Sequence, residues 1–215
     1  MHEYTVVNHP RKNILFLLAV ISTSLSGFIS FFVDHYLNSI WGGISIPISS
    51  MSIFGLLYLL FNHILWRFKL FQKIFSFPDL NGEWECNGSS MNIDLQKNFD
   101  WEGTVIIKQT WDKVLITLKT KNSKSKSLSI TGGIKYYAGD GFKLSYHYAN
   151  TPNATTETDL RKHEGFCVLT FGEDAQTAEG YYFNNTKDRQ SYGEMYLKRR
   201  NPDGQKQLPE ETRIA

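Results

Sequence analysis

Two long apolar segments without charged residues occupy the first third of the sequence and limit what the chain can fold into. Residues Ile14 to Phe32 form a stretch of nineteen residues that contains no Asp, Glu, Lys or Arg. At about 1.5 Å per residue, a helix over this stretch is roughly 28 Å long, close to the thickness of a bilayer core. The second segment, Ile44 to Trp66, has twenty-three residues without those four types, and its Pro47 is tolerable near a helix start. The pattern predicts a transmembrane helical hairpin.

The charges around these segments predict how the hairpin is oriented. Five basic residues flank it, two before the first segment and three after the second: Arg11, Lys12, Arg67, Lys69 and Lys73. The connection over residues 33–43 holds Asp34 but no Lys or Arg. Because positive flanks stay on the cytoplasmic side, both ends of the hairpin are expected in the cytoplasm. A cleaved signal peptide is the alternative for the first segment, but that run is longer than a usual signal core and no clear cleavage motif follows it.

After the second segment the hydrophobic pattern changes from apolar blocks to alternation. Val114, Ile116 and Leu118, for example, occupy every second position, which is the period of a strand with one buried face. Gly, Asp, Asn and Pro fall between the alternating runs and act as breakers. Eight short strands are therefore predicted, over residues 82–90, 103–109, 112–120, 126–135, 142–149, 164–172, 176–183 and 190–198.

Eight antiparallel strands in about 120 residues can close on themselves and leave room for one small ligand. The connections are mostly of hairpin length, and Gly82-Glu83-Trp84 resembles the Gly-x-Trp that starts the first strand of lipocalins. Lipocalins also place a basic residue across that Trp, and Arg199 or Arg200 could do the same. The predicted fold is a membrane α-helical hairpin plus an all-β domain, a lipocalin-like, eight-stranded antiparallel up-and-down β-barrel. A sandwich is the competing fold.

Three regions follow from these patterns. Residues 1–77 would hold a cytoplasmic N-terminus, the hairpin and a basic neck; residues 78–200 would form the ligand-binding barrel; residues 201–215 would be a polar tail. Residues 1–80 carry five Lys or Arg against three Asp or Glu, while residues 81–215 carry eighteen of each. A barrel with balanced charge lacks the broad basic face that binding to a nucleic-acid polymer needs.

Catalytic chemistry finds little support in the sequence. Cys86 and Cys167 lie in predicted strands without C-x-x-C spacing or a paired His, so reduced core cysteines are expected and no metal site. Glu83 and Glu85 share one face of a strand, which more often is a solvated outer face than an acid and base pair. Common phosphate-binding, nucleophile and zinc-protease motifs are absent from the sequence. We expect no enzyme and no catalytic residues.

Tyrosines are dense in the later strands and indicate a pocket. Aromatic rings with polar tips can stack on a base and hydrogen-bond its edge, and a Lys at the rim can meet a phosphate. The predicted ligand-binding residues are Tyr146, Tyr148, Tyr182, Tyr192, Tyr196 and Lys198. A tyrosine-rich packed core is the alternative, and a register error of one residue would turn any of these side chains outward.

Two short apolar segments, a basic neck and a barrel that opens with "FPDLNGEWECNG" together resemble a known family, over about residues 11–200. The chain is similar to the CD-NTase-associated membrane effectors of bacterial CBASS antiphage systems. The resemblance implies a barrel that binds a cyclic dinucleotide, made after infection by a partner nucleotidyltransferase. It also implies a bacterial inner-membrane protein whose membrane region assembles, disrupts the membrane and kills the infected cell. No cofactor other than this activating ligand is implied.

The hairpin is too simple to form a lesion as one copy, so self-association is expected. Gly27, Gly55 and several serines could let helices of neighbouring copies approach closely. Two other hypotheses remain open at this point. A membrane-anchored, lipocalin-like carrier would bind fatty acid or lipid in a dry apolar pocket. A structural membrane module would use the barrel to bind a protein partner and would have a packed interior.

Overall fold

A computed structural model describes residues 1–37, 49–91, 96–121, 125–151, 163–186 and 189–200. The chain forms two compact units. One is helical and contains Asn8–Phe77; the other contains the barrel, with Met1–Val7 and the chain from Pro78 onward. The sequence pattern predicted one region over residues 1–77, whereas the structure places the first seven residues in the barrel unit. They belong there because they pair with barrel strands.

The helical unit contains the two predicted apolar segments. Helix α1 (Arg11–Phe32) continues into a π-helical turn (Val33–Leu37), and together they give one apolar helix over Arg11–Tyr36, long enough to cross a bilayer. Helix α3 (Ser50–His63) starts at Ser49, whose hydroxyl accepts a hydrogen bond from the Met51 backbone N–H at 3.2 Å. A 3₁₀ turn (Leu65–Arg67) leads to α4 (Lys69–Phe75), and the chain bends by 91° at this break. Residues 44–48 of the second predicted segment, including Pro47, lie outside the described residues.

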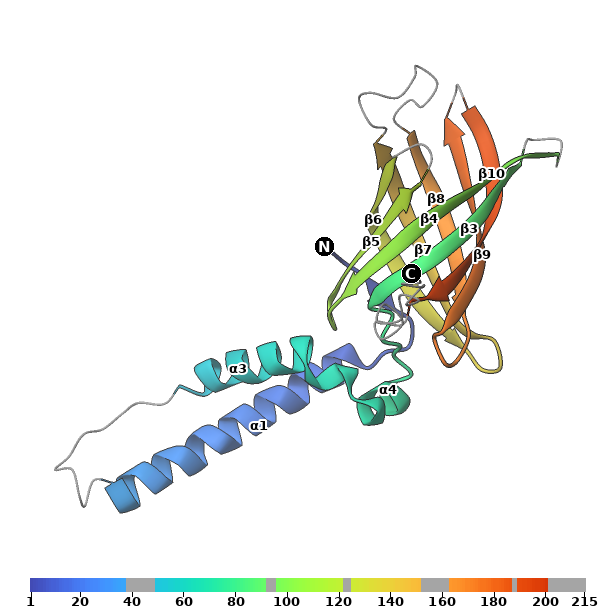
Figure 1. Cartoon of the computed structure of the whole chain (residues 1–215). Helices are drawn as coiled ribbons and strands as arrows, with labels where there is room; N and C mark the ends of the chain where they lie inside the picture. The colour runs from blue at the N-terminus through green and yellow to red at the C-terminus, as the bar shows by residue number, and fades with distance from the viewer. Residues whose placement is uncertain (38–48, 92–95, 122–124, 152–162, 187–188, 201–215) are drawn as a thin grey trace, which may run out of the picture. The chain divides into compact units, whose positions relative to one another are not determined.

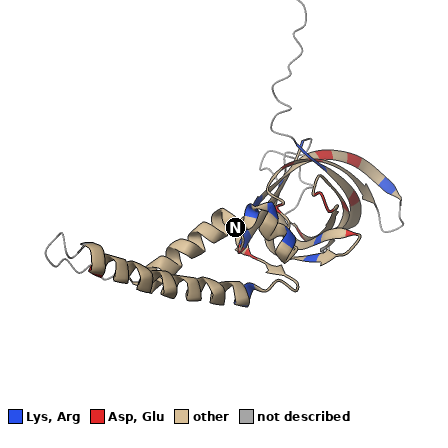
Figure 2. Ribbon diagram, turned by 90° about the horizontal axis from the view of Figure 1, so that it is seen from below, with Lys and Arg blue, Asp and Glu red and all other residues tan. Residues whose placement is uncertain are grey.

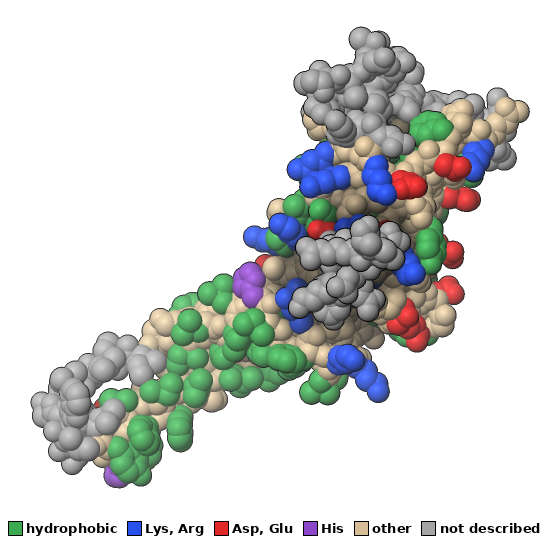
Figure 3. Space-filling model, viewed as in Figure 1, with side chains coloured by type: hydrophobic (Ala, Val, Ile, Leu, Met, Phe, Trp, Pro, Cys, Tyr) green, Lys and Arg blue, Asp and Glu red, His purple; other side chains and the backbone are tan. Residues whose placement is uncertain are grey.

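The surface of the helical unit is apolar. Helices α1 and α3 lie side by side (Figures 1 and 2) and bury Leu18 and Ile53, while Phe16 is 72% exposed and Met51 is 74% exposed. Figure 3 shows hydrophobic side chains covering the visible face of this pair. A water-soluble protein rarely exposes such a continuous apolar surface, so the unit associates with a membrane.

The barrel has the predicted fold. Among the described residues, eight strands pair in chain order and close on themselves (Figures 1 and 2). They are β3 (Gly82–Met91), β4 (Lys97–Gln109), β5 (Lys113–Thr120), β6 (Lys126–Tyr137), β7 (Gly141–Thr151), β8 (His163–Phe171), β9 (Thr177–Thr186) and β10 (Arg189–Arg199). Every neighbouring pair is antiparallel, and β10 pairs back onto β3. This is an up-and-down barrel, and the alternative of a sandwich is wrong.

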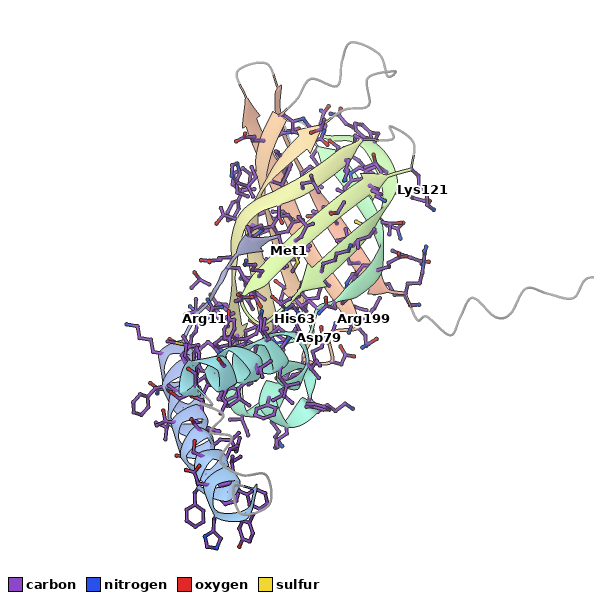
Figure 4. All side chains as sticks on the ribbon, turned by 90° about the vertical axis from the view of Figure 1, so that its left-hand side faces the viewer. Met1, Arg11, His63, Asp79, Lys121 and Arg199 are labelled. Carbon is purple, nitrogen blue, oxygen red and sulfur yellow. The ribbon has the colours of Figure 1, made fainter. Side chains whose placement is uncertain are left out.

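One end of the barrel is packed shut around the Gly-x-Trp sequence. The Trp84 side chain is fully buried, and its indole N–H donates to the Leu80 carbonyl at 3.2 Å. The Arg199 guanidinium lies 5.1 Å from the centre of the Trp84 ring and donates to the backbone carbonyls of Asp79, Asn81 and Ala175. Figure 4 shows Asp79 and Arg199 at the opposite end of the barrel from Lys121. Arg199 thus fills the role that the sequence assigned to Arg199 or Arg200.

The first residues of the chain complete the barrel wall. Strand β1 (His2–Glu3) pairs antiparallel with β5, and β2 (Thr5–Val6) pairs parallel with β6. Between these short strands, the Tyr4 side chain is only 4% exposed. Figure 4 shows Met1 against the barrel wall. We call residues Met1–Val7 the N-terminal strap.

Replacing Trp84 with Ala should strongly destabilise the barrel. Truncation of a fully buried Trp costs about 3–5 kcal/mol, because apolar burial is lost and a cavity is left. The measurement is chemical denaturation of the full chain, followed by circular dichroism. Phe183→Ala is the control, since Phe183 is 45% exposed and its loss should cost roughly 1 kcal/mol or less. A cost below about 1 kcal/mol for Trp84→Ala would contradict this account of the closed end.

Candidate ligand-binding site

The other end of the barrel contains a cavity of about 370 Å³. It lies where β3, β5, β7 and β9 end and where β4, β6, β8 and β10 begin. The connections at this end, 92–95, 122–124, 152–162 and 187–188, are outside the described residues. Strand alternation decides which side chains face inward. At the closed end the inward-facing side chains are large and apolar, such as Leu144, Leu169 and Phe171. Around the cavity the inward-facing side chains include hydroxyl, amide and tyrosine groups.

Three of the six predicted site residues line the cavity. Tyr146 and Tyr148 project from β7 and are 4% and 7% exposed, and Tyr182 projects from β9. Burial, together with the neighbouring Cys167 thiol, raises the pKa of the Tyr146 hydroxyl well above its usual value, so the group stays protonated. These tyrosines therefore offer neutral rings and phenolic hydroxyls to the cavity. Their role in ligand binding stays a prediction.

The structure does not bring the other three predicted residues into the cavity. In β10 the odd-numbered Ser191, Met195 and Leu197 are buried, so the even-numbered positions face outward. Tyr196 is accordingly 48% exposed and Lys198 is exposed. Tyr192 has the same parity as these two; its hydroxyl is enclosed and finds no hydrogen-bond partner in the described part of the chain.

Glycines that sequence reasoning missed hold the cavity aromatics against the wall. Three directly paired positions on neighbouring strands each combine a glycine with an aromatic residue: Gly88 with Trp101, Gly165 with Tyr148, and Gly193 with Tyr182. A Cβ atom on Gly88 would lie 2.3 Å from the Trp101 ring, and one on Gly165 would lie 2.4 Å from the Tyr148 hydroxyl oxygen. The missing side chains thus make room for the rings. An isolated glycine inside an alternating strand was the available signal.

Two aromatic rings from different strands are fixed to each other inside the cavity. The Trp101 indole N–H donates to the Tyr182 hydroxyl oxygen at 3.1 Å. Their ring centres are 5.9 Å apart in an edge-to-face arrangement. Such a pair is a rigid apolar platform with few rotatable bonds, the kind of surface on which a base can stack.

Two asparagines present amide groups to the cavity. Asn184 accepts hydrogen bonds at its carboxamide oxygen from the backbone N–H and the hydroxyl of Ser191, at 2.9 and 2.8 Å. Asn150 accepts one in the same way from the Ser127 hydroxyl at 3.1 Å. A backbone N–H can only donate, which fixes the oxygen of Asn184 toward Ser191. The amide N–H groups of Asn184 are therefore donors available to the cavity, and those of Asn150 are available in the same orientation, with its oxygen toward Ser127.

Paired charges lie near the cavity rim. Among the described residues that line the cavity there is no Lys or Arg, and its two acidic residues are both paired with lysines. Lys97 lies 2.8 Å from Asp100, and Lys121 lies 2.7 Å from Glu102. The hydrogen bond from Lys121, followed by its charge, lowers the pKa of the Glu102 carboxyl below its usual value. The local charge is therefore close to neutral, and both lysines are exposed and can reorient toward an anion.

The cysteines and the Glu83–Glu85 pair have structural rather than catalytic surroundings. Cys86 and Cys167 are reduced and buried, and burial raises the pKa of each thiol to about 12, so neither is a nucleophile near neutral pH. Glu83 and Glu85 face outward and pair with Arg200 at 3.2 and 3.4 Å. Within the described ranges, no group of three or more His, Cys, Asp or Glu could hold a metal ion.

A closed barrel with a cavity of aromatic rings and neutral hydrogen-bond donors at one end belongs to the class of small-molecule receptor domains. In this chain it is joined to a membrane-associated helical unit. Two family descriptions match: "Cap15, cyclic dinucleotide receptor domain" over residues 75–199, and "Cap15, TM helices" over residues 12–67. The chain is also 36% identical over 209 residues to CD-NTase-associated protein 15 of Yersinia aleksiciae. The matched region covers 92% of this chain and 97% of the relative. The chain belongs to the Cap15 family, and the predicted resemblance is confirmed.

Proposed function

We propose that this chain is a CBASS antiphage effector in which a cyclic dinucleotide, bound in the barrel cavity, triggers assembly of the helical units in the inner membrane. Assembly then disrupts the membrane and kills the infected cell. The observation that carries this proposal is the polar and aromatic cavity in a barrel domain of the cyclic dinucleotide receptor family. The ligand would come from a cyclic-oligonucleotide synthase associated with the protein.

The cavity donors fit a ligand with two similar halves. The Ser127–Asn150 pair lies on β6 and β7, and the Ser191–Asn184 pair lies on β9 and β10. Around the closed barrel only β8 lies between β7, which carries Asn150, and β9, which carries Asn184, so the two amides are about 10 Å apart along the wall. A cyclic dinucleotide repeats its sugar, phosphate and base twice. One amide could therefore donate to acceptor atoms of each half, while Tyr146, Tyr148 and the Trp101–Tyr182 platform pack on the bases.

The lipid-carrier hypothesis is less well supported. It predicts a dry apolar pocket, whereas two amides, several hydroxyls and His163 contribute to the lining of this cavity. Burial of the two amide NH₂ groups against an alkyl chain would leave these donors without acceptors, at a cost of about 1–3 kcal/mol each. The protein-partner hypothesis predicted a packed interior, which the cavity does not support.

Two spans with both ends in the cytoplasm are part of the proposal. Helix α1 with its π-helical turn supplies one span. Helix α3 with the following 3₁₀ turn supplies the second, and the bent α4, which contains Lys69 and Lys73, would lie at the cytoplasmic surface. The exposed apolar residues of α1 and α3 would face lipid or the helices of other copies.

Calorimetric titration tests the receptor half of the proposal. The full chain in detergent micelles is titrated with a panel of cyclic dinucleotides, with a linear dinucleotide and a fatty acid as controls. We expect selective, submicromolar binding of at least one cyclic dinucleotide and none of the controls. Binding of the fatty acid alone would establish the carrier instead, and a folded chain that binds no cyclic dinucleotide would refute the receptor function.

A further inference from the structure

The N-terminal strap fills a split in the wall of the barrel. Strands β5 and β6 pair directly over only three residue pairs, Thr117–Lys119 with Lys126–Leu128. Beyond these pairs the strap lies between them, with His2 opposite Val114 of β5 and Val6 opposite Ile134 of β6. The Val7 backbone N–H donates to the Ile134 carbonyl at 2.9 Å. The strap is therefore a seated part of the sheet rather than a loose leader.

Hydrogen bonds connect the strap to the wall of the cavity through Ser129 of β6. The Ser129 hydroxyl oxygen accepts from the Ile116 backbone N–H at 2.9 Å, and the His2 Nε2 atom lies 2.8 Å from the same oxygen. The Ile116 side chain lines the cavity, as does Ser127, two residues before Ser129 on β6. A ligand that shifts β5 against β6 therefore acts directly on the strand residues with which the strap pairs.

At the closed end of the barrel, one side chain holds the middle of the strap and the start of the segment that returns from the helical unit. Gln109 is 5% exposed; its amide nitrogen donates to the Tyr4 hydroxyl oxygen at 2.9 Å and to the Pro78 carbonyl at 3.1 Å. Its amide oxygen accepts from the Leu80 backbone N–H at 2.9 Å. Tyr4 precedes the first residue of α1, Arg11, by seven positions, and Pro78 follows the last residue of α4, Phe75, by three.

We infer that the strap and the Gln109 amide together form the mechanical link that couples occupancy of the cavity to the helical unit. The inference rests on the proposed function, whose triggering step it explains. A flexible connection cannot transmit a shift of strands, because its ends move independently. Here the connection before α1 is anchored in the ligand-bearing wall, and Gln109 ties it to the connection after α4, so a change in the wall acts on both ends of the helical unit at once.

The substitution Gln109→Glu tests the link. It keeps the size of the side chain but replaces the donating NH₂ by an acceptor oxygen, so the bond to the Pro78 carbonyl is lost and the contact with Tyr4 must reverse. We expect the affinity of the full chain for the activating cyclic dinucleotide to change by less than about threefold. Ligand-dependent dye release from vesicles that contain the protein should fall at least tenfold. Gln176→Glu is the matched control, because Gln176 is exposed and the substitution adds the same charge away from the strap. This variant should behave like the wild type.

A second variant and a second measurement keep the inference testable if Gln109→Glu does not fold. Tyr4→Phe removes the hydroxyl that accepts from Gln109 and donates to the Thr110 carbonyl at 3.1 Å, and it should reduce dye release without loss of binding. In the wild type, hydrogen exchange of the backbone amides in residues 2–7 should change when ligand is added. Full dye release from a variant that binds ligand, or unchanged exchange in the strap, would overturn the link. A wild-type chain that binds no cyclic dinucleotide would instead remove the proposed function itself.

Discussion

Replacement of Asn184 by Asp is expected to weaken cyclic dinucleotide binding by roughly a hundredfold. The substitution preserves shape and the acceptor oxygen that Ser191 uses, but it places a carboxylate where an amide donor faced the cavity. At a separation of about 5 Å and an effective dielectric constant of about 20, repulsion between this carboxylate and a ligand phosphate costs roughly 3 kcal/mol. Calorimetric titration at neutral pH measures the effect.

The pH dependence of that variant identifies the cause. Burial and the nearby ligand phosphate raise the pKa of the introduced carboxyl, and the two hydrogen bonds from Ser191 oppose this rise. Below its pKa the group is neutral and can donate a hydrogen bond again. Affinity should therefore recover as the pH falls toward 5 when it is compared with that of the wild type at the same pH, because both proteins share the titratable groups of the lining. Asn184→Ala should lose only about tenfold and show no such recovery, and Gln176→Glu, at the closed end, should bind normally. Wild-type affinity for Asn184→Asp at neutral pH would exclude Asn184 from the site.

Replacement of Gly27 or Gly55 by Leu is expected to abolish ligand-dependent killing while leaving ligand affinity unchanged. A Cβ atom at either glycine would have no atom of another segment of the described chain within 4 Å, so a side chain there starts in open space within one copy. Any loss must then come from contacts between copies, where small residues allow close helix approach. Growth and membrane integrity after co-expression with the synthase are the measurements, with titration of each purified variant.

Phe16→Leu is the control for these variants. Phe16 is 72% exposed on α1 and a change between two large apolar residues alters no close approach of backbones, so killing should persist. If both glycine variants kill as efficiently as the wild type, the assembly does not use these helix surfaces. If either loses ligand affinity as well, the effect lies in folding rather than in assembly.

Much of the fold could be predicted because it depends on local patterns. The alternation in β5 and β7, the uncharged segments and Gly82-Glu83-Trp84 each indicated an element, and all eight predicted strands overlap the observed ones. Gly82 has a φ of +137°, a conformation that favours glycine, which explains why this residue introduces the buried Trp84.

The parts that could not be predicted depend on register and on distant pairing. Both faces of β10 carry large side chains, so alternation could not show that Met195 faces inward and Tyr196 outward. Strands β1 and β2 have two residues each, too few for any period, and their partners are more than 100 residues away. The polar cavity residues Asn150 and Asn184 stand next to strand ends, where asparagine usually indicates a turn.

The strap also sets the order in which the protein can be completed during synthesis. Its residues are made before α1 and α3, but β6, with which the strap pairs up to Ile134, is made only after both of these helices. In the topology that we propose, the strap waits on the cytoplasmic side while the hairpin enters the membrane, and it joins the sheet as a late, long-range contact. A bulky fusion before Met1 would hinder the pairing of the strap with β5 and β6, whereas a fusion after Arg200 would not hinder it.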